Sequence, residues 1–123
     1  MEYLFVGIGG ILGSLTRFSL GKFISDKFHT VFPVGTFIIN ITGALLLGVV
    51  SSMGLKSNLN LLLADGFLGA YTTFSTFMYE GFNLFKDNEK LNAVLYILGS
   101  LIIGLVGFIA GMALVKIGAQ RSL

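Results

Sequence analysis

The sequence predicts an all-α integral membrane protein with four transmembrane helices, the third broken near its middle, in a single domain. Three observations predict this class. The 123 residues are 54% hydrophobic and only 11% charged, whereas an average soluble domain carries about 25% charged residues. Four apolar runs each reach the roughly 20 residues that a helix needs to cross a bilayer. A hydroxyl-rich stretch interrupts the third run.

The same composition excludes several functional classes. So few charged residues cannot cover a soluble enzyme, and the chain is too apolar to be disordered. The eight Lys and Arg residues are scattered and form no basic face, so nucleic acid is not an expected partner. With no cysteine, the chain has no disulfide framework, thiolate metal site or cysteine nucleophile.

The first two spans are predicted at about 4–23 and 32–53. The polar segment 25–30 separates them. Pro33 suits the first turn of the second helix, because the N–H that proline lacks has no helical partner at that position.

The third and fourth spans are predicted at about 59–82 and 91–117. Segment 54–58 is a short polar turn before the third span. Segment 86–90, Lys-Asp-Asn-Glu-Lys, is the most charged stretch and is expected to be a loop. The four spans leave only short connections outside the membrane.

The third span contains Thr-Thr-Phe-Ser-Thr-Phe at 72–77, preceded by Gly66 and Gly69. Hydroxyl and β-branched residues after glycines favour helix formation poorly, so we expect a break that frees backbone carbonyls. At membrane depth such carbonyls are tolerated only inside protein or beside a cavity. They are also good ligands for a hard cation.

The loop charges give almost no preferred orientation. The side with both termini carries three cations and the opposite side carries four: Lys56, Lys116 and Arg121 against Lys22, Lys27, Lys86 and Lys90. One interpretation is a weak topology signal. The other is insertion in both orientations, which gives an antiparallel dual-topology homodimer.

Glycines recur at helical spacing inside the spans, as in Gly9 with Gly13 and Gly107 with Gly111. Small residues let helix backbones approach closely in lipid. They indicate either tight packing within one subunit or a subunit interface. Because four short helices enclose little space, a conduit or carrier of this size predicts a homo-oligomer.

Four polar or aromatic residues could surround a small anion. Thr36 and Asn40 are four residues apart, so they share one helix face, and both can donate hydrogen bonds. Phe74 and Phe77 are neighbours on the third span, and the edge of an aromatic ring is electropositive. Alternatively, Asn40 forms an interhelical hydrogen bond and the two phenylalanines are core residues.

Three further residues are candidates. Tyr96 and Ser100 share a face of the fourth span and either continue a polar track or bond a neighbouring backbone. Arg17 is the one strong charge well inside a span; it either extends to the interface or acts near a vestibule.

These residues lie in three motifs that resemble those of the Fluc (CrcB) fluoride channels, and the resemblance covers the whole chain in length and span count. The third motif is the most specific. Ser14 stands where alanine is expected, and Tyr71 where an aliphatic residue is common. The motifs run over 9–18, 35–43 and 66–77, with sequences GGILGSLTRF, GTFIINITG and GFLGAYTTFSTF.

The resemblance implies an antiparallel homodimer with two pores, in a prokaryotic plasma or inner membrane, that carries fluoride passively out of the cell and is not an enzyme. It implies that Asn40 donates to fluoride while Phe74 and Phe77 present ring edges. It also implies the roles of the remaining residues: a polar track of Thr36, Tyr96 and Ser100, a vestibule position for Arg17, and a structural sodium ion at the dimer interface bound by the carbonyls of Gly69 and Thr72.

Two alternatives remain from the residues alone. A small dual-topology proton-coupled exporter of cations needs a carboxylate in the membrane, and Asp65 and Glu80 lie only near the ends of the third span. A non-conducting membrane assembly subunit fits the glycine packing but leaves the polar cluster at mid-depth unexplained.

Overall fold

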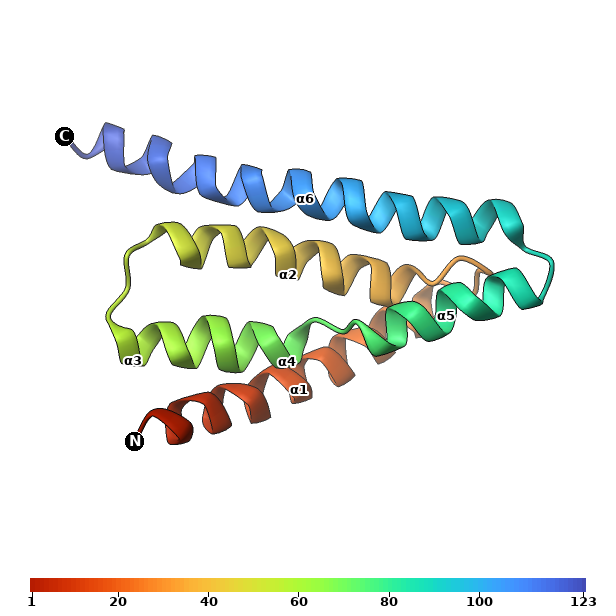
Figure 1. Cartoon of the computed structure of the whole chain (residues 1–123), viewed down its shortest axis with the longest axis horizontal. Helices are drawn as coiled ribbons and strands as arrows, with labels where there is room; N and C mark the ends of the chain where they lie inside the picture. Colours follow the sequence, from red (N-terminus) through yellow and green to blue (C-terminus); the bar gives the residue numbers. More distant parts are fainter.

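The computed structural model describes residues 1–123, and all of its regular secondary structure is helical. Three helices are long and apolar enough to cross a membrane: α1, α2 and α6. Figure 1 shows the helices as a bundle in which α6 runs beside α2. In chain order the elements are α1 (Glu2–Lys27), α2 (Val34–Ser52), α3 (Ser57–Asn60), η1 (Leu61–Leu68), α4 (Gly69–Tyr71), α5 (Ser75–Lys86) and α6 (Lys90–Arg121).

The first, second and fourth predicted spans correspond to α1, α2 and α6, with ends that differ by a few residues. Pro33 immediately precedes α2, and its carbonyl accepts the N–H of Phe37 at 3.1 Å. Proline therefore begins the helix without losing a hydrogen bond.

The third predicted span is interrupted, as its hydroxyl-rich stretch predicts. Helix α4 ends at Tyr71, Thr72 is extended with φ −79° and ψ 157°, and α5 begins at Ser75. Figure 1 shows this stretch as a length of coil between α4 and α5. The sequence did not predict that the first half contains a π-helix, η1, whose wider turns often occur at functional sites.

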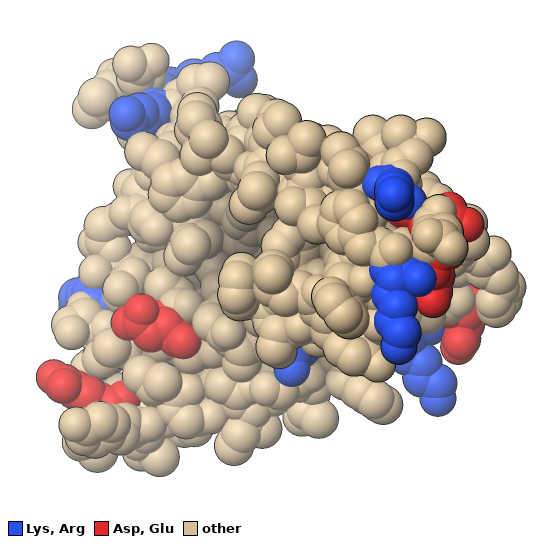
Figure 2. All heavy atoms as spheres, turned by 45° about the vertical axis from the view of Figure 1, so that its right-hand side comes forward, with Lys and Arg blue, Asp and Glu red and all other residues tan.

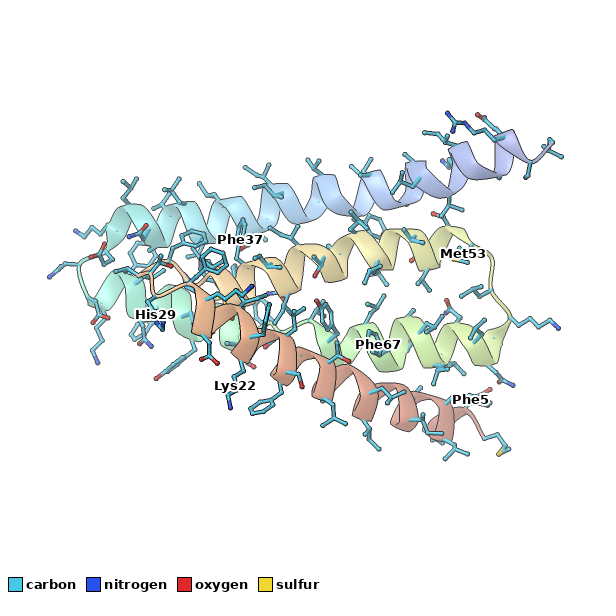
Figure 3. The ribbon with its side chains drawn as sticks, turned by 180° about the vertical axis from the view of Figure 1, so that it is seen from behind. Phe5, Lys22, His29, Phe37, Met53 and Phe67 are labelled. Atoms are coloured by element: carbon cyan, nitrogen blue, oxygen red, sulfur yellow. The ribbon has the colours of Figure 1, made fainter.

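Glycines allow the helix backbones to touch within one chain. A Cβ atom at Gly9 would overlap the carbonyl of Leu62, and one at Gly13 would overlap the carbonyl of Phe67, so α1 packs directly on η1. Figure 3 shows this side of the bundle, with α1 in front and Phe67 labelled on η1 behind it. The α2–α6 contact is similar, because a Cβ at Gly111 would overlap the carbonyl of Leu45. These contacts confirm close packing within one subunit.

Both chain termini and the turn before α3 lie at one end of the bundle (Figure 1). Figure 3 shows Phe5 and Met53 towards that end and His29 towards the other. The loop cations are therefore divided between the two ends as the sequence predicts.

Candidate functional site: a groove beside the broken helix

An open groove of about 570 Å³ lies against the break between α4 and α5. Its walls come from α2, η1, α4, the break, α5 and α6. Figure 2 shows a face of the molecule that is hollowed near its centre, with most charged side chains towards its margins. Six of the nine predicted site residues line the groove: Asn40, Gly69, Thr72, Phe74, Phe77 and Ser100.

Asn40 binds the backbone of the break. Its Nδ2 donates to the carbonyl of Thr73 at 2.9 Å, and the N–H of Thr73 donates to Oδ1 of Asn40, also at 2.9 Å. The interhelical hydrogen bond that the sequence left open is therefore present. An asparagine amide has two N–H donors, so one donor remains after the bond to Thr73.

The same pairing frees a carbonyl on α4. In a continuous α-helix the N–H of Thr73 would bond the carbonyl of Gly69, but here it bonds Asn40. The hydroxyl of Thr73 accepts the N–H of Thr76 at 3.2 Å and so satisfies one donor at the start of α5. The side chains of Asn40 and Thr73 thus hydrogen-bond the backbone at the break and at the start of α5.

Arg17 of α1 also contacts the break, from a pocket that Asn40 does not line. Its Nη1 lies 3.4 Å from the carbonyl oxygen of Thr72, a long hydrogen bond. Arg17, Thr36, Thr73 and Thr76 line a second pocket of about 310 Å³. Thr73 lines both spaces, so the groove and the arginine-lined pocket both border the break.

Phe74 and Phe77 differ in their surroundings. Their ring centroids are 6.2 Å apart with an interplanar angle of 43°. Phe74 is 74% exposed, whereas Phe77 is only 7% exposed and packs on Tyr96 at 5.2 Å between centroids. The ring of Phe74 is therefore free to meet another molecule, and Phe77 belongs to the core as well as to the groove wall.

Tyr96 and Ser100 carry buried hydroxyls without a hydrogen-bond partner. Tyr96 is fully buried. Unpaired buried polar atoms are rare in folded proteins, so these hydroxyls are available to a small ion or to water. Only Ser100 reaches the groove; Tyr96 lies behind Phe77.

Thr36 contacts a residue that the sequence analysis did not assign to the site. Its hydroxyl donates to Oε1 of Glu80 at 2.7 Å, and both residues line a pocket of about 290 Å³ together with residues of the 25–35 segment. The sequence spacing could have indicated Glu80 as a site residue, because Glu80 follows Phe77 by three residues and so lies on a neighbouring part of the same helix face.

The oxygen atoms at the break suit a hard cation. The structure contains no group of three or more His, Cys, Asp and Glu side chains that could hold a metal ion. The carbonyl of Gly69 has lost its helical partner, and the carbonyl of Thr72, which is the extended residue at the break, accepts only the long bond from Arg17. Both residues line the same groove, and carbonyl oxygens are ligands that hard cations accept.

Comparison with known proteins identifies the family. The model of the family described as "CrcB-like protein, Camphor Resistance (CrcB)" matches residues 4–112. A Clostridium acetobutylicum protein named fluoride-specific ion channel FluC 2 is 60% identical over 111 residues, which are 90% of this chain and 95% of the relative. A Bacillus cereus protein of the same name is 43% identical over 114 residues, 93% and 97% of the two chains. The Prosthecochloris aestuarii fluoride-specific ion channel FluC is 43% identical over 119 residues, 93% and 92% of the two chains. This chain is a member of the CrcB family.

Proposed function

We propose that the chain is a fluoride-selective ion channel of the bacterial cell membrane, and not an enzyme, that lets fluoride leave the cell passively. One observation carries the proposal: relatives up to 60% identical over nearly their whole length are named fluoride-specific ion channels. The groove supports it from the residues, because a free amide donor and aromatic rings meet at the broken helix.

The chemistry of the groove fits a small anion that has lost its water. An isolated buried charge is penalised by many kcal/mol, so several donors must replace the lost hydration. Asn40 with one N–H donor left, the exposed ring of Phe74 and Ser100 with its unpaired hydroxyl all line the groove. Thr36, Tyr96 and Phe77 would continue this path towards Glu80 at one end of the bundle.

A second copy of the chain completes the proposed pathway. Irregular backbone at membrane depth is tolerated only inside protein or beside a water-filled cavity, yet the break borders an open groove and Phe74 is 74% exposed. The near balance of loop cations supports an antiparallel partner. The complete channel would then be a dual-topology homodimer with two pores, and each subunit would be one domain that crosses the bilayer four times.

The carbonyls of Gly69 and Thr72 would hold a structural sodium ion at the dimer interface. A bound sodium ion supplies positive charge that keeps these oxygens in place. If sodium binds these two carbonyls, replacing it with the bulky cation N-methylglucamine should lower the melting temperature of the detergent-solubilised protein. An unchanged melting temperature contradicts the sodium site without affecting the channel function.

The direction of transport follows from acid–base chemistry and the membrane potential. Hydrogen fluoride is a weak acid that crosses membranes in its neutral form and dissociates in the cytoplasm. A negative interior then drives the anion outward, with about 2.3 kcal/mol available per charge at 100 mV. A passive pore is therefore sufficient to lower cytoplasmic fluoride.

A fluoride-selective electrode tests this function on sealed vesicles that contain the purified protein and a fluoride load. The proposal predicts fast fluoride efflux once valinomycin compensates the charge with potassium, and no efflux from protein-free vesicles. A proton-coupled cation exporter or a non-conducting assembly subunit would give no such release.

A further inference from the structure

We propose that Tyr71 and Thr42 are positioning residues for the fluoride path, because their hydroxyl groups hold the first half of the broken helix against α2. This inference rests on the proposed channel function and adds two residues to it. The two hydroxyl oxygens lie 2.9 Å apart, although the residues are 29 positions apart in the sequence.

The direction of this hydrogen bond follows from the donors available. The hydroxyl of Thr42 has a single proton, and its oxygen lies 2.7 Å from the carbonyl of Ile38, one turn earlier in α2. When Thr42 donates to Ile38, Tyr71 must be the donor to Thr42. The result is a chain of hydrogen bonds from Tyr71 through Thr42 to the backbone of α2.

The ring of Tyr71 is held firmly enough to transmit this restraint. Tyr71 is only 4% exposed, and its ring stacks on Phe67 of η1 with a centroid separation of 5.9 Å and an interplanar angle of 12°. Gly43, next to Thr42, brings α2 close: a Cβ there would overlap the methyl group of Thr72 and lie 3.3 Å from Cδ1 of Tyr71.

The break is thereby attached to α2 on both sides of Thr72. Tyr71, the residue before it, bonds Thr42, and Thr73, the residue after it, bonds Asn40. With only the Asn40 pairing, the end of α4 could rotate relative to the groove. With both attachments, Thr72 and Phe74 keep fixed positions in the groove wall that they share with Asn40.

Removing the hydroxyl of Tyr71 and removing that of Thr42 have different consequences for the remaining partner. In Tyr71→Phe, Thr42 still bonds Ile38, so no polar group loses its last partner. In Thr42→Val, the buried hydroxyl of Tyr71 is left without an acceptor, which costs more than losing the bond itself. In the double variant Tyr71→Phe/Thr42→Val, both groups are gone and that extra cost disappears.

The test measures initial fluoride efflux per folded protein in vesicles, together with the melting temperature, for four variants and one control. We expect Tyr71→Phe to reduce efflux about fivefold, the factor that one hydrogen bond is typically worth. Fluoride efflux through Thr42→Val should be lower still. Efflux through the double variant should recover to the level of Tyr71→Phe, and Thr42→Ser should retain parental efflux. The control Thr16→Val removes a hydroxyl that bonds only its own helix, to Leu12 at 2.8 Å, and should change nothing.

The outcomes separate this inference from the channel function. A parent protein that passes fluoride while Tyr71→Phe and Thr42→Val do so equally well overturns the positioning role alone. The role is also overturned if Thr42→Ser behaves like Thr42→Val, or if the double variant shows the product of the two single losses. A parent that passes no fluoride overturns the proposed function and this inference with it.

Discussion

Asn40 and Thr73 are joined by two hydrogen bonds of 2.9 Å, one in each direction, between a side chain of α2 and the backbone of the broken segment. This pairing satisfies both backbone groups of a residue that has left the helix. Asn40 also lines the groove that Phe74 borders, and its amide has a second N–H donor. The structural role of Asn40 and its proposed role in fluoride binding therefore depend on the same side chain.

Asn40→Ala is predicted to reduce both stability and fluoride efflux. The N–H and carbonyl of Thr73 would lose their partners; a fully buried group left unpaired costs about 1–3 kcal/mol, and Thr73 is half-buried, so each loss is at most of this size. Thermal unfolding in detergent and vesicle efflux measure the two effects. Asn92→Ala is the matched control, because it removes an amide that only bonds Glu89 near the start of α6. Parental melting temperature and efflux in Asn40→Ala would show that the pairing is unimportant.

Phe74→Ile is predicted to abolish most fluoride efflux while the protein stays folded. Isoleucine keeps an apolar side chain but has no electropositive ring edge, and Phe74 is too exposed to contribute much to the core. Phe77→Ile should reduce efflux and also lower the melting temperature, since Phe77 is buried against Tyr96. Phe82→Ile, on the same helix and 67% exposed, is the control for a lost surface ring. Unchanged efflux in both Phe74→Ile and Phe77→Ile would refute the aromatic role.

Gly9→Ala is predicted to destabilise the fold severely, whereas Gly10→Ala should leave it intact. A methyl group at Gly9 would overlap the backbone of η1, with the N atom of Phe67 only 2.8 Å away. Nothing lies within 4 Å of a Cβ at Gly10. Overpacking of this kind typically costs about 1–3 kcal/mol, and backbone cannot move aside as a side chain can. Equal yields and melting temperatures for the two variants would mean that α1 does not pack on η1 as described.

Much of the fold could be predicted from the sequence because lipid imposes a simple rule. The helices α1, α2 and α6 follow directly from apolar runs of sufficient length. The break could be predicted because Thr72, Thr73, Ser75 and Thr76 supply hydroxyls where a helix would gain little from them. Both signals are local in the chain.

The remaining features depend on contacts between distant residues. The π-helix η1 adjoins the glycine face of α1, and no local pattern specifies that contact. The residues Asn40, Thr36 and Arg17 were recognisable as polar groups at membrane depth, but their partners lie 33, 44 and 55 positions away. Periodicity places a side chain on a helix face and does not say which element that face meets.

Extra lysines at one end of the bundle are predicted to remove activity by forcing one orientation. Three lysines added to the turn at 54–58 would give that end six cations against four, and cytoplasmic loops favour Lys and Arg. Co-expression with a copy that carries three extra lysines in the 86–90 loop should restore fluoride efflux. Because the chain has no cysteine, a single cysteine at its C-terminus reports orientation by labelling. Full efflux from a single forced orientation would rule out the antiparallel dimer.

The central claim is that this chain forms a path selective for fluoride. The most direct measurement follows fluoride and chloride efflux from one batch of protein-loaded vesicles, with two ion-selective electrodes. The groove is lined by small donors and aromatic rings, and Arg17 lines the neighbouring pocket instead, so no lysine or arginine in the groove wall holds a larger anion. We predict rapid fluoride release while chloride remains in the vesicles. Chloride release as fast as that of fluoride, or no release of either ion, would contradict the account.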